Sequence, residues 1–495
     1  MRLIVVSNRL PVVLGRRDDG TWESHPGSGG LVSALQPILR DRHGIWIGWL
    51  GSDFGDCPER RAALAVATRE AGYALVPVDI PPEDHDVFYR GFANESIWPL
   101  FHDLPSLCRF DPSYYPAAVR ANAHFAATIA EHATRDDDFI WVHDYHLMGA
   151  ARAMRDLGMT SRLAFFMHIP FPPVDLFMKL PWRFEVLRDL LEFDLIGLQT
   201  PRDRRNFLQC VRFLVGDARL SSRGQVASVR TGSRLVRVGA FPIGIDFKEF
   251  SEHAASEEVA TLSAGIRGEE GGRSILLGVD RLDYTKGLPH RLEAFARALD
   301  LYPELRGRVT LAQFVVPSRA DIPQYAEFKG QLEQRVGEIN GRFSRAGWVP
   351  MYYVYRALDR TRLLAWYRSA DVALVTPLKD GMNLVAKEYC AANPRGVLVL
   401  SEFAGAASQL QRGALLVNPH DIDGTAAAIA RAVDMPESER RSRMRKMRRA
   451  VREHDIFWWL DSFLAAADAQ RAPDFPVLEE YFPSKDATRE ESSRP

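Results

Sequence analysis

The sequence predicts an α/β protein built on two doubly wound parallel sheets, and two observations support this prediction. Short apolar runs alternate along the chain with longer segments of helical periodicity, which is the order that parallel sheets with helical crossovers require. The chain has 495 residues, more than one ordinary hydrophobic core holds, so two domains of roughly 200 to 250 residues are expected.

The expected strands are apolar runs bounded by polar or turn-forming residues. In the first half of the chain these runs are 3–6, 45–49, 74–78, 139–143, 163–167 and 194–197. In the second half they are 274–279, 309–315, 371–375, 397–400 and 414–417. Each half therefore supplies enough strands for a sheet of its own, although no sequence repeat relates the halves.

The domain boundary is expected near the segment FPIGID at 241–246, where a proline and a glycine follow an apolar run. The first domain is then residues 1–240 and the second is residues 241–455. Residues 456–480 carry an apolar helical stripe and are expected to form a C-terminal helix that packs back across the domains. Residues 481–495 are polar and are expected to form a flexible tail.

Composition excludes several classes of function. The apolar fraction of 46% is typical of a globular protein, and the formal net charge of −1 gives no reason to expect nucleic acid or an acidic membrane surface as a partner. The cysteines Cys57, Cys108, Cys210 and Cys390 form no CxxC pair, which argues against a zinc site or a disulfide framework. No run approaches the roughly 18 apolar residues that span a bilayer. A reducing cytoplasm is therefore the expected location.

The most informative segment is DGMNLVAKE, from Asp380 to Glu388, because a tight polar turn stands directly before a helical pattern. The N–H groups at a helix start lie at the positive end of its dipole, so those of Leu384 and Val385 can receive a diphosphate. Glu388 lies one turn further on the same face and can accept hydrogen bonds from a ribose diol. An isolated turn of this kind more often only joins a strand to a helix.

A second cationic segment strengthens the interpretation as a nucleotide-sugar site. Arg281 and Lys286 lie in VDRLDYTKGL, between a strand-like run and a helical pattern. Two cations in one loop suit a diphosphate, since arginine offers a fork of donors and lysine a point charge.

The first half carries candidates for a second ligand. Arg9 follows the first expected strand, and the glycines of GSGGL, which include Gly29 and Gly30, can let a sugar or phosphate approach the backbone closely. Tyr89 and Trp98 flank a polar segment and could stack on a sugar, although core packing explains such aromatics equally well.

Two further candidates follow strands of the first half. Asp144 comes after the strand of WVHDYHL, and His168 comes after the strand of FFMHIPFP. Active-site groups of open sheets lie at such positions. Either His143 or His168 could instead be a buried ring that holds a loop.

These motifs together resemble the trehalose-6-phosphate synthase family of retaining glycosyltransferases over roughly residues 1–470. The motifs occur in the family's order: SNRLP, GSGGL, the 89–98 segment, WVHDYHL, FFMHIPFP, FPIGID, DRLDYTKGLP, EINGRF, GWVPMYY, TPLKDGMNLVAKEY and LSEFAGAA. The resemblance implies two Rossmann-like domains facing a cleft, the GT-B type, with the acceptor held by the first domain and the donor by the second.

The resemblance also implies a role for each matched residue. Arg9, Tyr89, Trp98 and Arg319 would bind the phosphate end of glucose 6-phosphate, and Asp144 would bind a hydroxyl of that sugar. His168 would contact the transferred glucose of UDP-glucose. The rest of the donor would be held by Gly30, Arg281, Lys286, Leu358, Asp380, Leu384, Val385, Ala386, Lys387 and Glu388, with Leu358 contacting the uracil through its main chain.

The implied reaction moves glucose from UDP-glucose to glucose 6-phosphate with retention of configuration, giving trehalose 6-phosphate and UDP. Catalytic roles would fall to Arg281, Lys286, His168 and Asp144, and neither a metal nor another cofactor is expected. No carboxylate stands out as a nucleophile, so same-face attack is implied, with the leaving phosphate taking the acceptor proton.

Two alternatives remain open from the sequence. Glucosylglycerol-phosphate synthases share the donor half, and the segment PPVDLFMKLPWR resembles theirs, which would make glycerol 3-phosphate the acceptor. A non-catalytic subunit that senses sugar phosphates is the second alternative. The sequence also leaves open the nucleotide base, the regulation and whether the chain forms a homo-oligomer.

Overall fold

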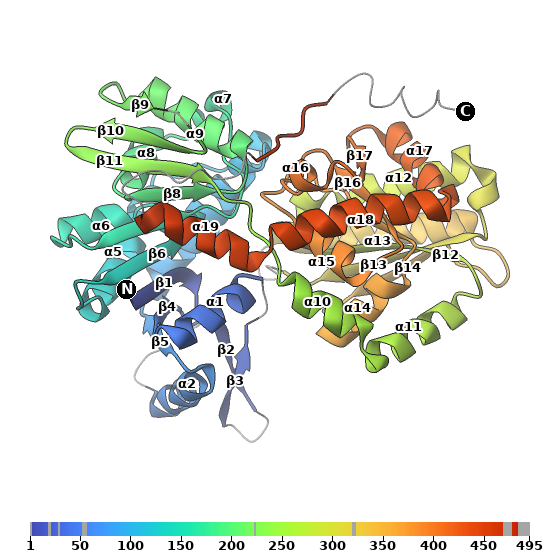
Figure 1. Cartoon of the computed structure of the whole chain (residues 1–495), viewed down its shortest axis with the longest axis horizontal. Coiled ribbons are helices and arrows are strands. Elements are labelled where there is room, and N and C mark those ends of the chain that lie inside the picture. The colour runs from blue at the N-terminus through green and yellow to red at the C-terminus, as the bar shows by residue number, and fades with distance from the viewer. Residues whose placement is uncertain are drawn as a thin grey trace. The chain divides into compact units, whose positions relative to one another are not determined.

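The protein is described by a computed structural model over residues 2–17, 21–27, 30–51, 57–221, 224–318, 323–468 and 478–483. Its contacts divide the chain into two compact units (Figure 1). Unit 1 comprises Met1–Pro242 with Trp459–Leu478, and unit 2 comprises Ile243–Trp458 with Glu479–Pro495. The expected tail at 481–495 lies outside the described residues beyond position 483.

Unit 1 contains a nine-stranded sheet in the order β5-β4-β1-β6-β7-β8-β11-β10-β9. The strands from β5 through β11 in this order run parallel, whereas β10 and β9 are antiparallel additions at one edge. The chain leaves β1 toward β5 in one direction and resumes at β6 in the other, which is the strand order of a Rossmann fold. The strands are β1 (Arg2–Arg9), β4 (Ile45–Trp49), β5 (Ala74–Val78), β6 (Asp138–His143), β7 (Arg162–Phe166), β8 (Leu195–Leu198), β9 (Arg219–Ser221), β10 (Val226–Thr231) and β11 (Arg234–Ala240).

Unit 2 contains a six-stranded sheet, β14-β13-β12-β15-β16-β17, in which every pair is parallel. Its chain also starts in the middle, turns one way to β14 and then the other way to β17. Six strands of unit 1, β5-β4-β1-β6-β7-β8, therefore have the same order as the six strands of unit 2. The topological switch lies between β1 and β6 in unit 1 and between β12 and β15 in unit 2. The strands are β12 (Ser274–Arg281), β13 (Val309–Val316), β14 (Met351–Tyr355), β15 (Val372–Val375), β16 (Val397–Ser401) and β17 (Leu415–Val417).

The predicted fold class, two Rossmann-like domains of the GT-B type, is confirmed. Every expected strand is present, some with the predicted ends and the others with slightly shifted ends. The sequence did not reveal the hairpin of β2 (Val12–Arg16) and β3 (Trp22–Pro26), nor β9, β10, β11 and β14 as strands. Arginines interrupt the apolar run of β11, and much of β2 and β14 is not buried, so neither pattern resembles the buried strands of a parallel sheet.

The helices of unit 1 surround its sheet, and several begin with sequence signals. Thr200 and Asp203 form a capping box at the start of α9, where Pro201 occupies the first helical position. The helices are α1 (Gly30–Asp41), α2 (Pro58–Ala71), α3 (Pro82–His85), α4 (Trp98–Phe101), α5 (Tyr114–His132), α6 (Ala150–Asp156), α7 (Val174–Phe177), α8 (Arg183–Leu190) and α9 (Pro201–Leu214), with the π-helix η1 (Asp86–Ile97) and the 3-10 turns η2 (Pro105–Leu107) and η3 (Tyr145–Leu147).

The last described helix, α19 (Ile456–Asp468), packs on the sheet of unit 1 from Trp459 onward. Phe463 stacks on Trp141 of β6 at 4.3 Å between ring centroids, and Trp459 meets the edge of Phe166 of β7 at 5.1 Å. Gly197 of β8 makes room for this contact, because a Cβ there would lie 2.6 Å from the rings of both Phe166 and Phe463. The C-terminal segment thus completes the core of the first unit.

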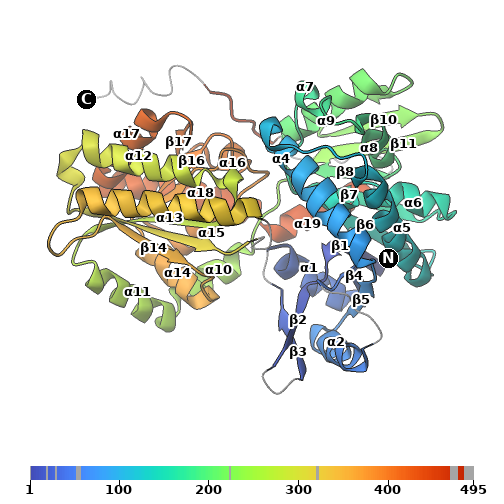
Figure 2. The same ribbon diagram turned by 180° about the vertical axis from the view of Figure 1, so that it is seen from behind.

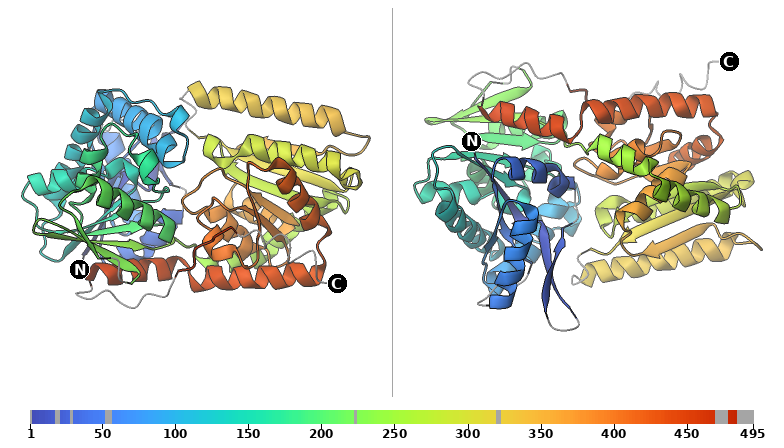
Figure 3. Two further views of the ribbon diagram at one scale, coloured as in Figure 1. Left: turned by 90° about the horizontal axis from the view of Figure 1, so that it is seen from above. Right: turned by 60° about the horizontal axis from the view of Figure 1, so that its bottom comes forward.

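Unit 2 is a three-layer structure. One hydrophobic core joins the sheet to α12, α13 and α17, while α18 lies on the other side (Figure 2, Figure 3). The helices are α10 (Phe247–Ala255), α11 (Glu257–Glu269), α12 (Leu288–Leu301), α13 (Pro323–Phe343), α14 (Arg360–Ser369), α15 (Leu384–Ala392), α16 (Ala407–Leu410), α17 (Ile422–Asp434) and α18 (Glu437–Glu453), with the 3-10 turns η4 (Tyr284–Lys286) and η5 (Pro303–Leu305).

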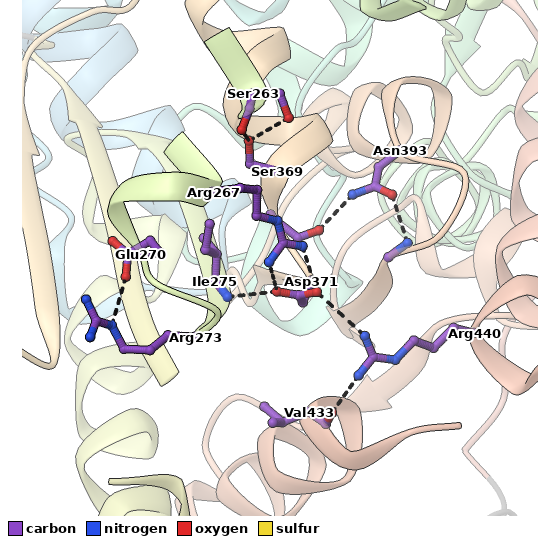
Figure 4. A network of polar contacts seen from close by, with 12 residues as sticks. Ser263, Arg267, Glu270, Arg273, Ile275, Ser369, Asp371, Asn393, Val433 and Arg440 are labelled. Carbon is purple, nitrogen blue, oxygen red and sulfur yellow. Dashed lines mark hydrogen bonds and ion pairs between the residues drawn. The ribbon is translucent and has the colours of Figure 1, made fainter. Parts of the chain in front are cut away.

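An ion network fixes the amino-terminal edge of this second sheet (Figure 4). Asp371, just before β15, accepts two hydrogen bonds of 2.8 Å from Arg267 of α11 and one of 2.9 Å from the backbone N–H of Ile275. Arg440 of α18 approaches the same carboxylate at 3.7 Å. Charges at this edge therefore pair with one another and tie helices to the sheet. Among the helices described, none is long and apolar enough to cross a membrane.

Candidate active site

In each unit, residues singled out from the sequence lie at the carboxyl ends of the strands beside the topological switch. Arg9 is the last residue of β1 and Asp144 directly follows β6 in unit 1. Arg281 is the last residue of β12, and the turn from Asp380 follows β15 in unit 2. Open parallel sheets bind ligands at these positions, so each unit has one candidate site.

Arg9 projects among aromatic rings. It is exposed, and its guanidinium carbon lies 5.0 Å from the ring centroid of Trp49 and 5.8 Å from that of Tyr89. Both rings present an electron-rich face to a cation, which restrains the arginine without neutralising it. An exposed guanidinium held beside two rings can present its donors to an anion such as a phosphate.

The rings beside Arg9 continue as a stack through this part of unit 1. Trp49 stacks on His85 at 3.7 Å, His85 on Tyr89 at 5.3 Å, and Tyr89 on His146 at 5.8 Å. Neither His85 nor His146 was among the candidate site residues, although His146 stands in the WVHDYHL motif, two residues after the candidate Asp144. The stack fixes the orientation of Tyr89 beside the arginine.

Tyr89 and Trp98 are both held by the π-helix η1, a rare conformation that recurs at functional sites. Tyr89 lies within it and Trp98 is the next residue after its end. Asn94 donates to the carbonyl of Tyr89 at 2.6 Å, and the hydroxyl of Tyr145 donates to Asn94 at 3.3 Å. Trp98 is buried, and its ring centroid lies 5.6 Å from that of Tyr145. Core packing therefore explains Trp98 better than it explains Tyr89, which is half-buried.

Asp144 adopts a backbone conformation that costs free energy. Its φ of 75° is uncommon for a residue other than glycine. Its N–H donates to the carbonyl of Phe166 at 2.8 Å, and its carboxylate accepts the N–H of His168 at 3.2 Å. Strained positions that neighbouring strands hold in place cluster at functional sites. Asp144 and His168, 24 residues apart in sequence, are thus linked directly.

His168 also contacts a second histidine. Its Nε2 lies 3.1 Å from Nδ1 of His143, which is completely buried. Burial lowers the pKa of His168 to about 3, and burial together with His168 lowers the pKa of His143 well below its ordinary value. Both rings are therefore neutral at pH 7. Of the two predicted alternatives, His143 is the buried supporting ring, and His168 is a neutral hydrogen-bonding group.

In unit 2, Lys286 forms an ion pair with Asp380. Nζ of Lys286 lies 2.6 Å from Oδ2 of Asp380, and both side chains are largely buried. Gly287 follows with a φ of 65°, and a Cβ there would lie 2.4 Å from the carbonyl of Thr376, so the turn requires glycine. The two predicted donor-site segments, 94 residues apart, therefore meet in one place. Arg281 beside them is exposed.

The start of α15 has the geometry expected for binding an anion. Asn383, with a φ of 76°, is its N-cap and accepts the N–H of Ala386 at 3.2 Å. Helix geometry leaves the N–H groups of Leu384 and Val385 without partners in the helix. The side chain of Asn383 also donates to Asp380 at 3.1 Å, which joins the cap to the ion pair. Asn383 belonged to the predicted turn but had no predicted role.

Two side chains further along α15 point to different partners. Glu388 is half-buried and accepts the hydroxyl of Tyr367 at 2.9 Å, and burial raises its pKa. Lys387 is completely buried, donates to the carbonyl of Ile243 at 2.6 Å, and burial lowers its pKa to about 7. Its ammonium is thus engaged inside unit 2, and only its main chain remains for a ligand.

A buried network that was not predicted supports Lys286 from below. Arg291 of α12 is 1% exposed and pairs with Asp280 of β12. It also donates to Thr376 at 3.0 Å, to Gln313 at 3.1 Å and to the carbonyl of Lys286 at 3.5 Å. The sequence held a signal for it, because Arg291 shares the helix face of the buried Leu288, Leu292 and Phe295.

The remaining predicted residues lie as follows. Gly30 is the first residue of α1, and Leu358 lies half-buried just before α14. Arg319 and Gly29 lie outside the described residues. Within the described ranges, no three histidine, cysteine, aspartate or glutamate side chains group so that they could hold a metal ion.

The chain matches one protein family, and the relatives named here share one name. The model of glycosyltransferase family 20 matches residues 1–469. The trehalose-6-phosphate synthase of Mycolicibacterium vanbaalenii is 44% identical over 477 residues, covering 94% of this chain and 95% of the relative. That of Mycobacterium sp. (strain JLS) is 43% identical and covers 95% of this chain and 97% of the relative.

Solved structures agree in fold and in chain length. An alpha,alpha-trehalose-phosphate synthase (UDP-forming) from Burkholderia xenovorans, in complex with glucose-6-phosphate, has a TM-score of 0.84 and 37% identity, covering 95% of this chain and 100% of that one. The structure "Trehalose-6-phosphate from E. coli bound with UDP-2-fluoro glucose" has a TM-score of 0.83 and 36% identity, covering 94% and 99%.

Proposed function

The chain belongs to glycosyltransferase family 20, and on that premise we propose that it is a retaining glucosyltransferase acting on UDP-glucose and glucose 6-phosphate. Its products are trehalose 6-phosphate and UDP. One observation carries the proposal. Both sheets share a six-strand Rossmann order, and residues of the family's motifs lie beside the switch point of each, Arg9 and Asp144 in unit 1 and Arg281 in unit 2.

In this proposal unit 1, about residues 1–240, binds the acceptor. Arg9 holds the phosphate of glucose 6-phosphate, and Tyr89 and Trp98 complete that end of the pocket. The support for Arg9 is its exposed guanidinium beside two aromatic rings. Asp144 accepts a sugar hydroxyl, for which its strained and fixed position is suited.

Unit 2, about residues 241–455, binds the donor. Arg281, Lys286 and the N–H groups of Leu384 and Val385 hold the diphosphate, together with the main chain of Ala386 and Lys387 in the same helix. Glu388 binds the ribose and Leu358 the base through its main chain. The support is the convergence of Lys286, Asp380 and the capped start of α15.

The chemistry follows from these charges. Breaking the glucose–phosphate bond builds negative charge on the UDP oxygen, and the fixed cations Arg281 and Lys286 stabilise that charge more in the transition state than in the substrate. His168 is neutral, so it orients the transferred glucose by a hydrogen bond rather than by charge. The leaving phosphate takes the acceptor proton, which needs no cofactor. The expected location is the cytoplasm, where cysteines stay reduced.

A turnover assay tests the assignment. Purified protein is given UDP-glucose with either glucose 6-phosphate or glycerol 3-phosphate, and UDP release is measured. We expect release with glucose 6-phosphate. Release only with glycerol 3-phosphate would instead assign a glucosylglycerol-phosphate synthase, and binding of both substrates without release would assign a sensor. Repeating the assay with ADP- and GDP-glucose tests the base.

A further inference from the structure

Unit 1 contains a pocket that is lined by none of the residues proposed above to bind a ligand. It has a volume of about 410 Å³ and is walled by α5, α6 and α8, of which α5 and α6 lie side by side (Figure 1). Its walls are largely apolar, with Phe92, Ala126, Met148 and Val186 among them. This size and lining are typical of pockets that bind small molecules.

The floor of the pocket carries a buried oxygen with no hydrogen-bond partner in the described part of the chain. Asn122 of α5 is 2% exposed, and its Nδ2 donates to the carbonyls of Ala118 at 2.8 Å and His146 at 3.2 Å. Both of these neighbours are acceptors, so they fix the amide with its nitrogen toward them. Oδ1 is left unsatisfied. A buried acceptor of this kind costs free energy until a donor reaches it.

A carboxylate lies beside this oxygen. Asp189 of α8 is 9% exposed, and its Oδ2 accepts the hydroxyl of Tyr115 at 2.9 Å. Arg152 lies 3.6 Å from the other oxygen but is closer to Glu192, at 2.8 Å. Both acceptors face Gly149, because a Cβ placed there would lie 3.5 Å from Oδ2 of Asp189 and 3.7 Å from Oδ1 of Asn122. Two oxygens thus converge on one residue without a side chain.

From this geometry we propose that the pocket binds a small molecule with an apolar body and a protonated amine, the amine lying over Gly149 between Asp189 and Asn122. The apolar body contacts Phe92 and Val186. An anion is disfavoured because Asp156 and Asp189 line the pocket against the single cation Arg152.

The pocket shares a wall with the proposed acceptor residues. His146 is among the residues that line it, and the ring of His146 stacks on Tyr89 at an interplanar angle of 9°. Phe92, which also lines it, belongs to the same π-helix as Tyr89. An occupant would therefore contact residues that position Tyr89. Binding to the pocket itself does not depend on the proposed function and can be measured without either substrate.

Phenethylamine, 2-phenylethanol and phenylacetate serve as matched probes, since they share the phenyl group and differ in the charge of the polar end. Titration calorimetry with the full chain measures their binding. We expect the amine to bind and the alcohol to bind about tenfold or more weakly, because the charged hydrogen bond is lost. Phenylacetate should not bind. Equal binding of amine and anion, or no binding of any probe, would overturn the proposal.

Two variants locate the site. Gly149→Ala puts a methyl group between the two oxygens without backbone strain, since its φ is −88°, and should abolish binding of the amine. Gly216→Ala, which meets nothing within 4 Å, is the control and should bind normally. Asp189→Asn should weaken the amine about tenfold and leave the alcohol unchanged. Unaltered amine binding in Gly149→Ala and Asp189→Asn would refute this location. Glucose transfer by these variants should persist, which separates failure here from failure of the proposed function.

Discussion

The switch-point edges of the two units share a topology and differ in chemistry. In unit 1 the edge is built mainly from rings, the stack from Trp49 to His146 and the uncharged pair His143–His168, together with the carboxylate of Asp144 and the cation Arg9. In unit 2 the edge is built from charges, with Lys286 paired to Asp380 above a buried arginine network.

This difference agrees with what each unit is proposed to bind. A sugar hydroxyl needs hydrogen bonds of fixed direction, which neutral rings and one strained carboxylate supply. A diphosphate that gains charge during the reaction needs positive charge that is already in place. The same strand order therefore serves two chemistries, and the side chains at the strand ends decide between them.

The largest effect is expected from the network below Lys286. Arg291→Met leaves Asp280 buried without its partner, so the free energy of unfolding should fall by about 3 to 5 kcal/mol. Urea denaturation measures it. Adding Asp280→Asn should restore part of the loss, because the uncompensated charge is then removed. A decrease in the free energy of unfolding of less than about 1 kcal/mol would mean that the Arg291–Asp280 pair does not stabilise unit 2.

Arg281→Ala tests how the positive charge at the same edge of unit 2 affects catalysis. The barrier should rise by about 2 to 4 kcal/mol, which lowers kcat/KM about 30- to 1,000-fold. Arg281 is exposed, so stability should change little. Arg273→Ala, just before the opposite end of the same strand, is the matched control and should keep its activity. Unchanged turnover in Arg281→Ala would contradict the donor-site placement.

Arg9→Ala tests the cation at the end of β1 in unit 1. Loss of charged hydrogen bonds worth about 1.5 to 3 kcal/mol should raise the KM for glucose 6-phosphate about 10- to 150-fold. The affinity for UDP should stay the same. Arg9→Lys keeps the charge but not the fork, so an intermediate KM is expected. An equal loss of UDP affinity would contradict the proposal that unit 1 binds the acceptor and unit 2 binds the donor.

The neutral histidine pair predicts a pH dependence. Folded His168 takes up a proton only near pH 3, whereas the unfolded chain does so below about 6.5, so unfolding is favoured as the pH falls from 6.5 toward 3. Between pH 6.5 and 5.5 the parent should lose about 1 kcal/mol more stability than His168→Asn. His43→Asn, at an exposed position whose φ of 46° suits asparagine, is the control. Parallel pH curves would show that burial does not lower the pKa of His168 in the folded protein.

Much of the fold was predictable because parallel strands are short apolar runs. Segments such as 45–49 and 74–78 were predicted with the observed bounds of β4 and β5. The hairpin of β2 and β3 was missed because its residues are mostly not buried and show no such run. The candidate site residues were chosen because they directly follow expected strands, and Arg9, Asp144 and Arg281 do lie at the carboxyl ends of strands.

The partners of these residues were not predictable. Asn383 as a cap and Glu388 one turn later follow from local spacing, but the contact of Lys286 with Asp380 joins segments 94 residues apart. The stacking of His85 and His146 on Tyr89 likewise joins three separate elements. Periodicity shows which face of an element is buried and does not show what lies against it.

The sequence by itself determined the two sets of strands, the polar residues at their carboxyl ends and the family. The tertiary structure alone decided that both sheets share one six-strand order, that His168 is neutral, that Lys387 faces Ile243 and that Asn122 and Asp189 converge on Gly149. The physical reason is that the two kinds of property depend on groups at different distances along the chain. Strand and helix preferences depend on neighbours along the chain, whereas protonation and pairing depend on groups that only packing brings together.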